Sequence, residues 1–273
     1  MEPFSLKERT ALYFEPAGAQ NRVIAGFSLR SGGMSWGNFS SLNLGLHVGD
    51  RPENVVMNRR LLGEEAGFPP ERWVCAQQVH GTRIARVNES HAGSGALELQ
   101  SAISETDGLF TTEENLLLAL CFADCVPVYF YVNEPAAVGI AHAGWRGTAG
   151  GIVSKMVRVL TDELNVRPDA IYAVIGPSIG QNDYEVDQTV MDEMMKLPCL
   201  SKGAAKEHGK GHFLLDLKAI NRSLLLDAGL PEAHIQVSSF NTCSEPDLFY
   251  SFRRDKGKTG RMMGFTGLKK KGV

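Results

Sequence analysis

The chain has 273 residues, of which 43% are hydrophobic and 22% are charged, and its formal net charge is −3. This composition is typical of a globular protein and excludes a strongly basic surface, so nucleic acid is not an expected partner. No apolar run approaches the roughly 18 residues that a membrane-spanning helix needs, so no membrane partner is expected either. The N-terminal residues also lack the apolar core of a signal peptide, and we expect a cytoplasmic protein.

The first elements in chain order are a strand over residues 23–29 and, after a polar loop, a helix. Asp50 is expected to cap this helix, with Pro52 in its first turn. Gly67 is expected to end it, because glycine readily adopts the left-handed conformation found after a helix.

Short apolar runs then predict further strands. Residues 73–79 and 83–87 are expected to be two strands joined by a tight connection, and the polar stretch 88–104 a mobile loop. Two buried strands follow over 116–122 and 128–132. The polar break between these two strands places Asp124 and Cys125 at a strand end.

A glycine-rich turn follows the next apolar run, 136–141, and leads into a segment with helical periodicity over 152–164. The turn contains His142 and Arg146. Strand, glycine-rich turn and helix is an arrangement that presents backbone N–H groups to anions, and a histidine there adds a base or a metal ligand.

The second half alternates between short strands and helices, with Met191, Met194 and Met195 expected in the core. No internal repeat or linker is visible, so residues 1–273 are expected to form a single α/β domain with a mixed sheet and helices on its faces. The expected elements are strands over 171–175, 213–215 and 235–238 and helices over 187–197 and 217–228.

His80, Cys125 and His142 lie at the ends of three expected strands. Two imidazoles and a thiolate can bind Zn²⁺ and leave a fourth position open, which is the pattern of a catalytic site. The residues fit equally well a Cys125 nucleophile activated by a histidine, and a buried structural cysteine is the third interpretation. The other four cysteines are expected in the core, and five cysteines without a close pair fit a reducing compartment.

A set of motifs in a fixed order resembles one known family. The motifs are Ser41-Leu42-Asn43-Leu44, Val48-Gly49-Asp50, Gln78-Val79-His80-Gly81, Thr106-Asp107-Gly108, Ala123-Asp124-Cys125-Val126-Pro127, His142-Ala143-Gly144-Trp145-Arg146-Gly147 and Ile175-Gly176-Pro177-Ser178-Ile179-Gly180. The chain is similar over about residues 24–265 to the YfiH/YlmD family, also called the multicopper polyphenol oxidoreductase or laccase-domain family. In length and detail it looks most like the Bacillus-type YlmD members.

The resemblance implies a single-domain α-β-β-α sandwich with a mixed sheet, related to the cytotoxic-necrotizing-factor fold. It implies a zinc site formed by His80, Cys125 and His142. It further implies an enzyme, a purine nucleoside phosphorylase that uses phosphate with adenosine, inosine and S-methyl-5′-thioadenosine, and that also deaminates adenosine.

Residue chemistry suggests further roles for this activity. Arg146 is the first candidate for binding phosphate and Arg30 the second. Asp124, next to Cys125, is a candidate for moving protons or for orienting a ligand histidine. Asn43, like Asp107 and Tyr184, is a possible substrate contact or a residue that stabilises a loop.

Two other functions stay open. One is a cysteine-type amidohydrolase that edits peptidoglycan precursors, a role proposed for some members of the family. The other is a copper-dependent polyphenol oxidase, since Cu²⁺ competes well for sites with nitrogen ligands. The chain has seven histidines and no His-x-His segment, so a trinuclear copper cluster of the multicopper oxidase type is not expected.

Overall fold

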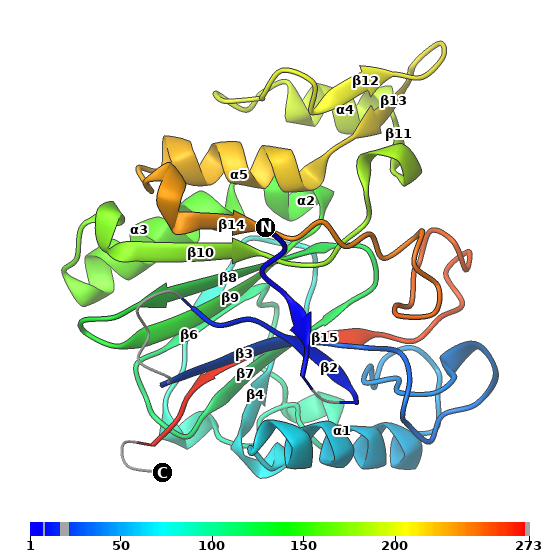
Figure 1. Ribbon diagram of the computed structural model, residues 1–273, viewed down its shortest axis with the longest axis vertical. Helices are drawn as coiled ribbons and strands as arrows, with labels where there is room; N and C mark the ends of the chain where they lie inside the picture. Colours follow the sequence, from blue (N-terminus) through cyan, green and yellow to red (C-terminus); the bar gives the residue numbers. More distant parts are fainter. Residues whose placement is uncertain (8, 17–21, 271–273) are drawn as a thin grey trace.

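Two six-stranded β-sheets pack face to face in the part of the chain that the structure describes, residues 1–7, 9–16 and 22–270. In this computed structural model, helices cover the outer face of each sheet, which gives four layers in the order helix, sheet, sheet, helix (Figure 1). The α-β-β-α sandwich implied by the family resemblance is thereby confirmed.

The first sheet is antiparallel except for the parallel pair β4 and β7. In spatial order its strands are β1 (Ser5–Leu6), β2 (Ala11–Tyr13), β3 (Val23–Ser28), β15 (Met262–Leu268), β7 (Leu117–Phe122) and β4 (Trp73–Cys75). α1 (Pro52–Ala66) packs on its outer face through Leu62 and Ala66.

The second sheet is mixed, with parallel pairs at both of its edges. In spatial order its strands are β14 (Ile235–Val237), β10 (Ile171–Ile175), β8 (Val126–Val132), β9 (Ala137–Ala143), β6 (Gly108–Thr111) and β5 (Ile84–Arg86). The helices on its outer face are α2 (Trp145–Ala149), α3 (Ile152–Leu164) and α5 (Leu217–Asp227).

A small third sheet and one helix project from the helical layer over the second sheet (Figure 1). The sheet consists of β11 (Glu185–Asp187), β13 (His212–Leu215) and β12 (Ala205–Glu207), and the helix is α4 (Gln188–Met194). In α4, Met191 and Met194 are buried as expected, but Met195 is 65% exposed, because the helix ends before it.

Strand periodicity explains why the sheets pack as they do. Successive side chains of a strand point to opposite faces, so in β7 Leu118 and Leu120 enter the core between the sheets while Leu117 and Ala119 face α1. Burying each large apolar side chain stabilises the fold by roughly 1.5–3 kcal/mol. Tyr129 also links the sheets, because its hydroxyl donates to the carbonyl of Gly26 at 2.7 Å.

Three sequence-based expectations about local structure were wrong. The runs 73–79 and 83–87 do not form paired strands, since β4 and β5 belong to different sheets. Asp50 does not cap α1, because its carboxylate accepts from Ser35 and Asn43 instead and Arg51 holds the cap position. The polar break before β8 is also shorter than expected, because the strand already begins at Val126.

The remaining differences concern length and order. Residues 88–104 form a loop that packs against the core, with Ala96 fully buried. β15, which lies in the centre of the first sheet, was missed altogether. The helices 52–66 and 152–164 and the strand 171–175 have the expected bounds.

No helix among the described residues has both the length and the apolar character needed to cross a membrane.

Candidate metal centre

His80, Cys125 and His142 come together although they belong to three separate segments. His80 follows β4 of the first sheet, Cys125 lies where the chain crosses from β7 to β8, and His142 is part of β9. Their ligand atoms all lie within 4.8 Å of one another, and they form the one such group of histidine, cysteine or acidic residues found among the described residues. The structure therefore gathers the three residues that the sequence singled out.

The direction of His142 follows from strand parity. Val138 and Ile140 of β9 point into the core between the sheets, and His142, two residues further on, points to the same side. Its ring lies 5.3 Å from that of Phe122, and the residue is only 3% exposed. The strand thus continues through His142, which the sequence had placed in the turn after it.

A connection of three residues places Cys125. Asp124 precedes it with a φ of 85°, in the left-handed region, and its carboxylate is buried. That carboxylate accepts from the hydroxyls of Thr242 (2.7 Å) and Ser251 (2.9 Å) and from the N–H of Arg253 (2.7 Å). These bonds engage both oxygens and anchor the connection that carries Cys125. The two roles expected from sequence, moving protons and orienting a ligand histidine, stay predictions.

The electrostatics of the centre favour a charged thiolate and imidazolium. Burial alone would raise the pKa of the Cys125 thiol, but the charges of His142 and His80 and their hydrogen bonds outweigh it and lower the pKa. Burial would lower the pKa of His142, whereas the Cys125 charge and the hydrogen bond to Asp107 raise it. The thiolate is the form of cysteine that binds metals and attacks electrophiles.

The donor set and its spacing fit a metal ion. Neighbouring ligand atoms of a tetrahedral zinc site lie about 3.3–3.8 Å apart, and the three ligand atoms here all lie within 4.8 Å of one another. Gly144 makes room, since a Cβ there would lie 3.0 Å from the Cys125 sulfur and 3.2 Å from the His80 ring. Three protein ligands leave a fourth position for water or substrate.

Two of the residues proposed from sequence to contact substrate are bonded to loops of the protein. The guanidinium of Arg30 donates to the carbonyls of Pro246 (2.9 Å) and Ser40 (3.2 Å). Asn43 is fully buried, accepts from the N–H groups of Gly45 and Arg261 and donates to Asp50. Both side chains therefore have partners within the protein, and their roles as substrate contacts stay predictions.

Arg146, the first phosphate candidate, is exposed in α2. Its guanidinium lies 4.3 Å from the centre of the Trp145 ring, which leaves hydrogen-bonding edges turned to solvent. Arg146 comes four residues after His142 in the chain, and its role in binding phosphate stays a prediction.

Sequence reasoning missed several neighbours of the centre. His47 is influenced by both ligand histidines, and desolvation together with the charges of Arg261 and Arg59 lowers its pKa to about 4. Arg253 lies over the ring of Tyr184, 5.2 Å from its centre. His47 and Arg253 are distant from the ligands along the chain and lie outside the motifs of the family resemblance, so no pattern in the sequence singled them out.

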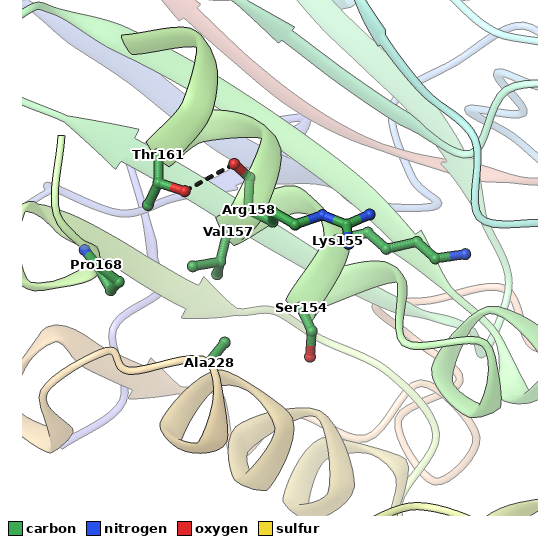
Figure 2. A pocket seen from close by; sticks show the side chains of 7 residues that line it. All are labelled: Ser154, Lys155, Val157, Arg158, Thr161, Pro168 and Ala228. Carbon is green, nitrogen blue, oxygen red and sulfur yellow. Dashed lines mark hydrogen bonds between the residues drawn. The ribbon is translucent and has the colours of Figure 1, made fainter. Parts of the chain in front are cut away.

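A cavity of about 380 Å³ lies elsewhere, between α3, Pro168 and Ala228, the residue directly after α5 (Figure 2). Its hydroxyls are already bonded within the protein, since Thr161 donates to the Arg158 carbonyl at 2.8 Å and Ser154 to the Leu224 carbonyl at 3.4 Å. Lys155 extends away from Pro168 and bonds to Thr82. The cavity therefore does not compete with the metal centre as a reactive site.

Fold and centre together define a class: two-sheet α/β sandwiches with a His-Cys-His metal centre between the sheets. The sequence model of the family described as "Multi-copper polyphenol oxidoreductase laccase" matches residues 24–269, and the chain belongs to this family.

Relatives of known structure or curated name support this membership. "Purine nucleoside phosphorylase YlmD" of Bacillus subtilis strain 168 is 46% identical over 98% of each chain, and the protein of that name from Geobacillus stearothermophilus is 50% identical over 90% of each. The crystal structure of Geobacillus YlmD matches with a TM-score of 0.96 at 47% identity, covering 99% of this chain and all of that one. A Neisseria meningitidis protein, NMB0706, matches with a TM-score of 0.82 at 33% identity, covering 96% of this chain and all of that one.

Proposed function

We propose that the protein is a zinc-dependent purine nucleoside phosphorylase that accepts adenosine, inosine and S-methyl-5′-thioadenosine and also deaminates adenosine. The observation that carries the proposal is the convergence of His80, Cys125 and His142 within 4.8 Å, in a chain nearly half identical to proteins named purine nucleoside phosphorylase. We place it in the cytoplasm, because all five cysteines are free thiols.

Each residue has a distinct task in this proposal. His80, Cys125 and His142 hold the metal ion, which when bound supplies positive charge and lowers the pKa of a coordinated water. Phosphorolysis forms a bond between a phosphate oxygen and the ribose C1′ as the bond from C1′ to the purine nitrogen breaks. Arg146 holds the phosphate dianion by charge-assisted hydrogen bonds, and Asp124 keeps Cys125 in place.

One observation favours a second candidate. The lowered pKa of Cys125 and its hydrogen bonds with two histidines suit a nucleophile as well as a ligand. A cysteine-type amidohydrolase acting on peptidoglycan precursors is therefore the alternative. Copper in place of zinc, with phenol oxidation, is a further alternative that the family's description suggests.

The test is inosine turnover with and without phosphate, with metal content measured on the same samples. We expect ribose 1-phosphate to form only when phosphate is present, and to be lost together with zinc in His80→Ala. His208→Ala, which changes an exposed histidine bonded to Glu185, is the matched control and should keep both. Zinc-loaded protein that leaves inosine unchanged would rule out the phosphorylase and make the amidohydrolase the next function to test.

Arg146→Ala tests the phosphate contact separately. Because Arg146 is exposed and its guanidinium lies over the Trp145 ring, its removal should leave folding and zinc content unchanged. We expect the KM for phosphate to rise at least about tenfold, as for the loss of a charge-assisted hydrogen bond worth 1.5–3 kcal/mol. An unchanged KM would remove Arg146 from the phosphate site without affecting the metal centre.

A further inference from the structure

Asp107 is a fully buried carboxylate that the proposed reaction does not use. It lies immediately before β6, and both of its oxygens are bonded to the segments that carry the histidine ligands. Oδ1 accepts from the His80 N–H at 3.0 Å and from Nδ1 of His142 at 2.8 Å. Oδ2 accepts from the N–H groups of Val79 at 3.1 Å and Gly81 at 2.8 Å.

The three backbone bonds explain the conformation of His80. Its φ of 59° lies in the left-handed region, which costs a residue with a side chain roughly 1–2 kcal/mol. This turn points three successive N–H groups at one place, and such a concave set of donors binds an anion. Here the anion is the carboxylate of Asp107, so the turn that presents the His80 ring closes around a side chain from the opposite sheet.

The fourth bond fixes the ring of His142. With Nδ1 bonded to Asp107, Nε2 is the nitrogen left for the metal ion. The backbone N–H of His142 also donates to the carbonyl of Asp107 at 2.7 Å, so main chain and side chain are both tied to one residue. The rings of His80 and His142 consequently lie 4.8 Å apart at an angle of 75°.

We propose that Asp107 is the positioning residue of the metal centre, holding the turn that carries His80 and the ring of His142 in metal-binding geometry through a single carboxylate. The proposal rests on the function proposed above only in assuming that the centre binds a metal ion. It does not depend on the substrate, because positioning precedes catalysis.

Asp107→Asn is the decisive variant. An amide keeps one acceptor oxygen, but its NH₂ group must then face N–H donors, so one of the two pairs of bonds is lost. We expect zinc affinity, measured by competition with a chelator, to fall about 10- to 100-fold, as for other partners that orient metal ligands. The measurement needs no nucleoside, so its result is independent of whether the protein is a phosphorylase.

The matched control is Glu65→Gln. Glu65 also binds several donors at once, accepting from the N–H and hydroxyl of Thr10 and from the hydroxyl of Tyr13, at the outer side of the first sheet. Gln should lower the unfolding temperature yet leave zinc affinity unchanged. If both variants lose affinity in proportion to their stability, or if Asp107→Asn binds zinc as tightly as the wild type, the positioning role is wrong.

A second measurement holds even if Asp107→Asn does not fold. In zinc-loaded wild-type protein with isotope-labelled histidine, NMR should show the proton of His142 on Nδ1 and the metal ion on Nε2. A proton on Nε2 would overturn the proposal, because the bond to Asp107 would then not set the ring.

Discussion

Single residues decide the shape of the centre, and Gly144 shows how little space it leaves. The residue directly follows β9, and a Cβ on it would lie 3.0 Å from the Cys125 sulfur and 3.2 Å from the His80 ring. Cβ contacts of 3.0–3.2 Å are tighter than nine in ten real ones, so in an alanine variant the Cys125 sulfur or the His80 ring has to give by a few tenths of an ångström. The absence of a side chain is therefore part of the metal site.

Gly144→Ala should weaken zinc binding at least about tenfold, comparable to the loss of a partner that orients a ligand. Gly139→Ala is the control. Gly139 lies within β9, and a Cβ there would meet backbone and Phe110 of the neighbouring strand at 3.2–3.3 Å, away from the ligands. Chelator competition and thermal unfolding of both variants provide the comparison. Equal zinc affinities in the two variants would show that the centre tolerates a methyl group at this position.

Elements differ in how readily their sequence reveals them. α3 has the periodicity of a half-buried helix and was predicted with its bounds, and α1 was recognised by Pro52 and Gly67. β15 was missed because Gly264 and Gly267 interrupt its apolar pattern. The packing requires these glycines, since a Cβ at Gly264 would lie 2.9 Å from both Phe122 and the Tyr129 hydroxyl.

The candidate site was predictable to a similar extent. Strand-end position and residue type singled out His80, Cys125 and His142, but could not separate a metal site from a nucleophile. The resemblance of motifs was needed for that step. The role of Asp107 could not be read from the chain, because it depends on four hydrogen bonds to residues 26–35 positions away.

The methionines of α4 give a test of the element boundary. Met194 is fully buried and Met195 is 65% exposed, although the sequence suggested that both lie in the core. Met194→Ala should lower the free energy of unfolding by about 2–5 kcal/mol, and Met195→Ala by no more than about 0.5 kcal/mol. Urea unfolding of the two variants checks this, and similar losses would mean that α4 extends further than described.

The loop around Asp255 predicts a dependence of stability on pH. Burial alone would raise the pKa of Asp255, but hydrogen bonds from Arg254 and Thr259 hold it below the ordinary value. A carboxylate with a lowered folded-state pKa stabilises the protein above its unfolded-state pKa, and this stabilisation is lost as the pH falls through the folded-state value. Between pH 7 and about pH 3, the unfolding temperature should therefore fall less in Asp255→Asn than in the wild type. Parallel curves of unfolding temperature against pH would contradict this.

At the scale of the whole molecule, the centre connects the two sheets, so metal binding should stabilise the entire sandwich. Zinc at about 100 times its Kd adds about 2.7 kcal/mol if only the folded state binds. This corresponds to a rise in unfolding temperature of roughly 5–10 °C.

Cys125→Ser should abolish this rise, whereas Cys199→Ser, at a half-buried thiol outside the centre, should keep it. Scanning calorimetry with and without zinc makes the comparison. A rise that persists in Cys125→Ser would place the stabilising zinc elsewhere.

The position of β15 has a consequence for how the protein is made. This strand is the last one described in chain order, yet it lies between β3 and β7 in the first sheet. While the ribosome is still adding residues before Met262, β3 and β7 have no strand between them. The first sheet, from which the chain leads to His80 and Cys125, is then incomplete. The ligands at 80, 125 and 142 thus leave the ribosome before the strand that completes the first sheet, and we expect metal loading to follow translation of residue 268.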